Sequence, residues 1–159
     1  MNIKMLIEFL NLLRWLFLTS PKDINEMKII VMKHFPFKGF TAMSWCGKII
    51  VRNKQNVDDA LINHETIHLK QAQTRGSWIR YYLLYLKEWI KGNPFKRPYI
   101  SAYYTNPYEM EAYANEGDKN YTAEYNKTNI DKYYLDDRKT IYIKQGENPS
   151  SWKKYIKTL

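Results

Sequence analysis

Residues 63–73 read NHETIHLKQAQ and contain two of the chain's three histidines, His64 and His68, with Glu65 directly after the first. In an α helix, residues four apart project about 40° from each other, so the two imidazoles would share one face. Two imidazoles on one face can bind a single metal ion, and Glu65 would place its carboxylate beside that ion. The stretch therefore predicts a metal site with an adjacent acid, on the condition that it is helical.

The flanking residues predict that helix. The polar segment NKQNVDD before the stretch offers Asn56 or Asp58 as an N-cap, and Gly76 after it is a typical residue to follow a helix C-terminus. We therefore expect a helix over 58–75.

A catalytic zinc ion takes three protein ligands and keeps a fourth position open for water. His34 lies earlier, in a predicted strand over 27–35, and the single cysteine, Cys46, excludes a cysteine-rich zinc module. The third ligand is therefore expected from a carboxylate downstream. The sequence NPYEMEAYANEGD predicts a short helix over 106–118 that is entered through Pro107. Its candidates are Glu109, Glu111 and Glu116.

HETIH followed by EMEAYANE resembles the gluzincin branch of the zincin metallopeptidases. HtpX-type endopeptidases carry E-x-x-A-D on the second helix, and ImmA/IrrE-type proteases carry E-x-x-A-N. The resemblance makes Glu109 the third zinc ligand, beside His64 and His68, and Ala112 the residue that packs on the HExxH helix. Tyr113 departs from the Asp or Asn of those families. A register shifted to Glu111, Ala114 and Asn115 restores Asn and keeps Glu111 as the alternative ligand.

The resemblance implies one zinc ion per chain and hydrolysis of peptide bonds by metal-activated water, with Glu65 as catalytic general base. The substrate would be a peptide or protein. Tyr103, Tyr104 and Tyr113 are candidates for stabilising the oxyanion. The longer string from GFTAMSWCGKIIVR to NPYEMEAYANE is also similar to short, uncharacterised bacterial HExxH proteins, across residues 30–120. A zincin-like module that binds metal or protein without proteolysis is the alternative.

The expected fold is α+β and zincin-like, with a small antiparallel sheet or hairpin packed on a mainly helical core. Segments 27–35 and 40–52 are the predicted strands, with a turn or bulge at Cys46-Gly47-Lys48. The strand over 40–52 resembles the edge strand along which zincins align a peptide. At 159 residues the chain suits one domain. Residues 77–92 are expected to form a helix, and residues 119–159 a polar C-terminal extension with a last short helix starting at Ser150 or Ser151.

Residues 3–18, IKMLIEFLNLLRWLFL, predict an amphipathic helix within an N-terminal segment, 1–20. The run is too short and too charged to span a bilayer. Two alternatives stay open: the helix packs on the domain, or it lies in a membrane interface. We expect core packing, with at most weak vesicle binding. The expected location is the cytoplasm, with peripheral contact at the inner membrane through residues 1–20 as the alternative.

The chain has 25 Lys and Arg against 16 Asp and Glu, a formal charge of +9, which favours anionic partners of any kind. A nucleic-acid-binding protein would cluster these cations with aromatic residues. Only KRPY at 96–99 and KKYIK at 153–157 approach that pattern. We therefore expect no specific nucleic-acid partner, and we attribute the charge to scattered surface lysines.

Overall fold

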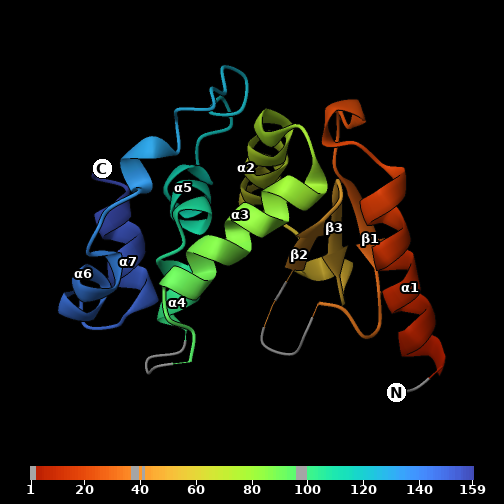
Figure 1. The fold of residues 1–159 in the computed structure, drawn as a ribbon, viewed down its shortest axis with the longest axis horizontal. Helices are drawn as coiled ribbons and strands as arrows, with labels where there is room; N and C mark the ends of the chain where they lie inside the picture. Colours follow the sequence, from red (N-terminus) through yellow and green to blue (C-terminus); the bar gives the residue numbers. More distant parts are fainter. Residues whose placement is uncertain (1–2, 37–39, 41, 96–99) are drawn as a thin grey trace. The chain divides into compact units, whose positions relative to one another are not determined.

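The computed structural model describes residues 3–36, 40, 42–95 and 100–159. These residues form α helices, short 3-10 helices and one small sheet (Figure 1). The expected α+β class is confirmed. The chain divides into two compact units, residues 1–79 and 80–159. The KRPY segment at 96–99 lies outside the described residues.

The first unit runs from the N-terminal helix to the HETIH helix. Its elements are α1 Ile3–Leu18, η1 Pro21–Asp23, β1 Lys28–Val31, β2 Ala42–Trp45, β3 Lys48–Val51, η2 Lys54–Asn56 and α2 Asp59–Arg75. The helix that carries HETIH has the expected ends. The Asp58 side chain caps α2 by accepting from the Leu61 N–H at 2.8 Å, and Gly76 ends it at φ 75°. Of the two expected caps, Asp58 is the one that serves α2.

The sheet has the strand order β1-β3-β2. The turn expected within segment 40–52 is present and makes the segment a hairpin, as anticipated: β2 and β3 pair antiparallel across Cys46 and Gly47. Both turn residues have positive φ, 48° and 75°, as a tight hairpin turn requires. A small antiparallel sheet was the wrong expectation, because β1 pairs parallel with β3, with Lys28 opposite Lys48. The sheet is mixed, with β2 at one edge.

The α1 helix lies beside the sheet (Figure 1) and packs on it through Leu12. Leu12 is buried with Ile50 of β3, and the Trp45 indole donates to the Leu12 carbonyl at 2.7 Å. Glu8 also turns inward, and its carboxylate accepts from the backbone N–H groups of Lys33 and His34 at 3.2 and 3.1 Å. Leu12 is the one buried residue of α1, so the helix packs on the sheet only in part, and apolar side chains such as Ile3, Ile7 and Phe17 stay exposed. No helix among the described residues is long and apolar enough to cross a membrane.

The second unit is mainly helical. Its elements are α3 Trp78–Lys91, which begins at the boundary, then α4 Ser101–Tyr104, α5 Pro107–Asn115, η3 Asp131–Tyr133, α6 Arg138–Lys144 and α7 Pro149–Ile156. The predicted helices over 77–92 and 106–118 are therefore present, the second one shorter than expected. Pro107 stands in the first turn of α5, and the Asn106 side chain caps it by accepting from the Tyr108 N–H at 3.2 Å.

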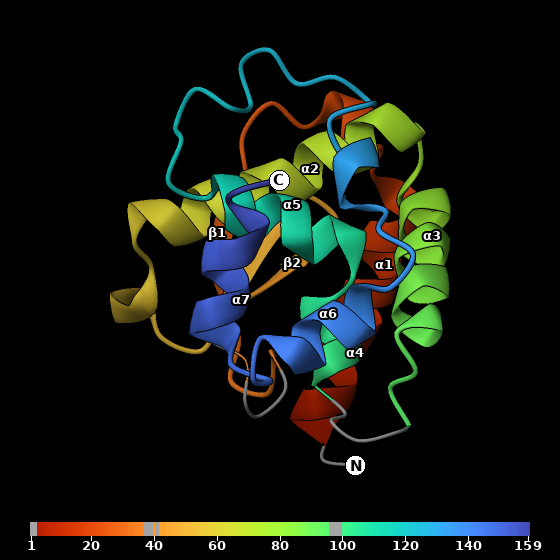
Figure 2. The ribbon, with the colours of Figure 1, turned by 90° about the vertical axis from the view of Figure 1, so that its left-hand side faces the viewer.

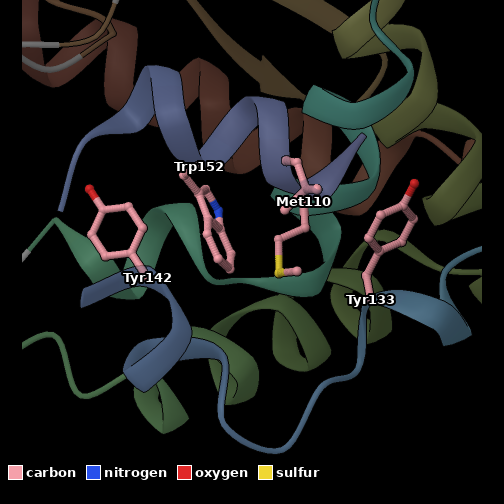
Figure 3. Close-up of a cluster of buried hydrophobic side chains, with 5 residues drawn as sticks. Met110, Tyr133, Tyr142 and Trp152 are labelled. Atoms are coloured by element: carbon pink, nitrogen blue, oxygen red, sulfur yellow. The ribbon is translucent and has the colours of Figure 1, made fainter. Parts of the chain in front are cut away.

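An aromatic core holds α5 in place within the second unit. Trp152, Tyr142, Tyr133 and Ile156 are fully buried with Met110 of α5 (Figure 3). The Trp152 indole donates to the Tyr104 carbonyl at 2.7 Å, which ties α7 to the end of α4. Figure 2 shows α7 alongside α5, in agreement with their contacts. Segment 119–159, expected as a polar extension, thus supplies core residues, and its last helix begins at Pro149, one residue before Ser150.

Candidate metal centre

His64 and His68 lie one turn apart on α2, and both are buried. Their Nε2 atoms are 3.2 Å apart and their rings meet edge to face. Two imidazole nitrogens bound to one zinc ion at about 2.0–2.1 Å, in tetrahedral geometry, lie about 3.3 Å from each other. The observed separation fits that requirement. The helical condition set by the sequence is met, and it brings the two nitrogens to a common point.

Gln71 holds the ring of His68. The Gln71 Oε1 lies 2.7 Å from His68 Nδ1, and Gln71 is 1% exposed. An amide oxygen only accepts, so Nδ1 must carry the hydrogen, and this leaves the lone pair of Nε2 directed toward His64. Gln71 was not among the predicted site residues. Its position three residues after His68, on the same helical face, was the signal that could have found it.

Glu65 follows His64 on α2 and is buried to a similar degree, 5% exposed. A carboxylate is rarely enclosed without a partner or a function. The group of described residues that could hold a metal ion, His64, His68 and Glu109, does not include Glu65.

Glu109, in the first turn of α5, is positioned by a tyrosine of α3. The Tyr85 hydroxyl donates to Glu109 Oε1 at 2.7 Å, and Glu109 is 4% exposed. Burial, and after it the Glu109 carboxylate, raises the pKa of Tyr85 well above its ordinary value of 10.0. Tyr85 therefore stays a neutral donor. No sequence signal distinguished it among 14 tyrosines.

Two of the three tyrosines considered for oxyanion stabilisation form a pair. The hydroxyls of Tyr103 and Tyr113 lie 3.1 Å apart. The pKa of each phenol is raised, mainly by burial and next by the negative charge of Glu109. Both phenols therefore remain neutral donors. Tyr104 and Tyr113 both pack against the aromatic core, and the Tyr104 ring also stacks on Tyr142 at 6.1 Å between centroids.

The rival carboxylates have other partners. Glu111 is fully buried and accepts from the hydroxyls of Tyr121 and Tyr125 at 2.8 and 3.1 Å. Glu116 lies 3.6 Å from Lys153. The third histidine, His34, lies in the first unit with its Nδ1 3.2 Å from Glu8.

Among the described residues, His64, His68 and Glu109 form one buried group. Each offers one ligand atom, and these atoms all lie within 4.8 Å of one another. A buried group of two imidazoles and one carboxylate could hold a metal ion. These are the three residues that the sequence selected as ligands, with Glu109 rather than Glu111.

Comparison of the chain with family models, with curated proteins and with solved structures finds no match.

Proposed function

We propose that this protein is a zinc-dependent metallopeptidase that holds zinc through His64, His68 and Glu109 and uses Glu65 as general base. The observation that carries the proposal is the pair of Nε2 atoms at 3.2 Å, with the His68 tautomer set by Gln71. Two imidazoles and one carboxylate are a ligand set of catalytic zinc sites, which keep a position open for water. The gluzincin resemblance rests on the same residues.

Zinc held there would polarise the scissile carbonyl and activate the attacking water. Glu65 would accept the proton of that water and deliver it to the leaving amine. Tyr85, as a neutral donor, keeps Glu109 oriented for its role as a ligand. Tyr103 and Tyr113 are neutral donors of the kind that stabilises an oxyanion.

A zincin-like fold is part of the proposal. The HETIH helix α2 contacts β2, which is an edge strand of the mixed sheet. An extended peptide could add to that edge by main-chain pairing. β2 would thus take the role that the sequence suggested for a longer edge strand over 40–52.

The test combines metal content with hydrolysis. Purified wild-type protein should carry about one zinc per chain, and His64→Ala/His68→Ala should carry none. Glu65→Gln should keep its zinc and its melting temperature but hydrolyse a mixed peptide library about 10²–10⁴ times more slowly.

Stoichiometric zinc in the double variant would refute the ligand assignment, and loss of zinc in Glu65→Gln would refute the general-base assignment. Full zinc occupancy with no hydrolysis of any peptide would instead favour a zincin-like module that binds without cutting.

A further inference from the structure

The outer face of α3 is apolar and exposed. Ile79, Leu83, Leu86 and Ile90 are 44%, 62%, 45% and 53% exposed. They follow one another at steps of four, three and four residues, so they share a stripe about 60° wide along the whole helix. A water-soluble helix usually presents polar residues in this position. A stripe of four large aliphatic side chains therefore indicates a surface that something covers.

The cations of α3 lie beside the apolar stripe, and its acid does not. Arg80, Lys87 and Lys91 flank the stripe and are exposed. The only acid in α3, Glu88, lies on the opposite side, 4% exposed, where Arg138 and Lys91 pair with its two oxygens at 2.8 Å each. The exposed part of α3 thus combines aliphatic side chains with cations and has no acid.

We propose that this outer face of α3 docks on the surface of a bilayer that contains anionic phospholipid. An interfacial helix lies in the membrane plane with its apolar side among the acyl chains and its cations at the headgroups. The half-buried Trp89 and Tyr82 flank the stripe on the side away from the cations, and such aromatic residues favour the headgroup level. This proposal does not depend on the metallopeptidase assignment.

Charge selects a membrane over a second copy of this chain. A second α3 face would bring further cations and no exposed acid to pair with them. An anionic headgroup layer supplies the missing negative charge, and the formal charge of +9 adds attraction over the whole protein.

The first unit has a helix of similar character, which provides the comparison. On α1, Ile3, Ile7, Leu10 and Phe17 are exposed, while its only acid, Glu8, is turned toward Lys33 and His34. An experiment must therefore separate α3 from α1.

The test is cosedimentation of the full chain with vesicles of phosphatidylcholine alone and with added phosphatidylglycerol. Wild-type protein should bind the mixed vesicles at least about tenfold more tightly, with only partial release by salt. Leu83→Gln/Leu86→Gln should weaken this binding by at least about tenfold, because both side chains leave the acyl region. Arg80→Gln/Lys87→Gln should also weaken it by roughly tenfold or more. All four positions are exposed, so the melting temperature should stay unchanged in both variants.

Two matched controls accompany these variants. Lys127→Gln/Lys144→Gln removes the same charge from exposed positions outside α3 and should change vesicle binding by less than about twofold. Ile7→Gln/Leu10→Gln makes the same kind of change on α1. The proposal is overturned if α3 variants bind mixed vesicles like the wild type, or if only the α1 variant loses binding. A stable dimer that ignores vesicles and is broken by Leu83→Gln/Leu86→Gln would identify a second copy as the occupant instead.

Discussion

Replacement of Gln71 by Met tests the metal centre without touching a ligand. The Gln71 Oε1 accepts from His68 Nδ1 at 2.7 Å, and methionine has a similar length but offers no comparable acceptor. The variant leaves His64, His68 and Glu109 in the chain. It removes the contact that fixes the His68 hydrogen on Nδ1, so Nε2 is no longer held in the form that a metal requires.

The expected cost follows from the role of such partners. Loss of a hydrogen-bond acceptor behind a metal-binding histidine typically lowers metal affinity by about 10–100-fold. That factor corresponds to about 1.4–2.7 kcal/mol of binding free energy. Because Gln71 is 1% exposed, water cannot readily replace its oxygen, which places the expectation toward the upper end. The metal-free variant should also lose about 1–3 kcal/mol of stability.

Zinc affinity is measured by competition with a chromogenic chelator on folded protein. Gln73→Met is the matched control, because Gln73 lies on the same helix and donates to the Pro21 and Ile24 carbonyls at 3.2 and 2.8 Å. It should lower stability and leave zinc affinity unchanged. Zinc affinity of Gln71→Met within about twofold of the wild type would refute the reasoning, and so would an equal loss in both variants.

Four further predictions concern other parts of the chain. Glu109→Gln should weaken zinc binding by more than about tenfold, whereas Glu111→Gln should keep zinc and lose about 2 kcal/mol or more of stability; equal zinc affinities would contradict this. Trp152→Ala should lower the free energy of unfolding by about 3–5 kcal/mol in denaturant titration, and a loss below about 1 kcal/mol would show that the aromatic core is not cooperative. Burial and Glu111 raise the pKa of Tyr121 above 10.0, so the folded state holds this proton more tightly than the unfolded chain. The contribution of Tyr121 to the free energy of unfolding should therefore be fully present below pH 10 and be lost as the pH rises above it. Tyr121→Phe should make the fall of the unfolding free energy with pH less steep in this range. Deletion of residues 1–20 should lower the melting temperature sharply, and a truncated protein that melts like the full chain would argue against core packing.

Local signals accounted for the helix ends. Asp58 and Gly76 bound α2, and Pro107 marks the first turn of α5, because capping and backbone geometry act within a few residues. The approach of His64 and His68 was also readable, since a spacing of four residues on a helix fixes it, whereas the choice of Glu109 rested on the gluzincin resemblance.

Long-range pairing was not readable in the same way. Nothing local shows that Lys28 lies opposite Lys48 in a parallel ladder, because either strand direction would bury the same residues. The C-terminal segment looked polar because aliphatic residues are few there. Its core is built from Trp152, Tyr142 and Tyr133, whose polar groups find partners only in the folded chain.

The mixed sheet also sets an order of events in folding. The β2–β3 hairpin joins residues that are close in the chain, and hairpins of this kind form in about 1–10 μs. The parallel ladder of β1 must close a much longer loop, and α1 then needs both pieces, since Leu12 meets Trp45 of the hairpin while Glu8 meets the residues after β1. Loop-closure entropy therefore places the N-terminal helix last. During synthesis, the sixteen residues of α1 can dock only after more than thirty further residues have been made, because α1 contacts Trp45 of the hairpin. Pulse-labelled hydrogen exchange should therefore find β3 protected before α1.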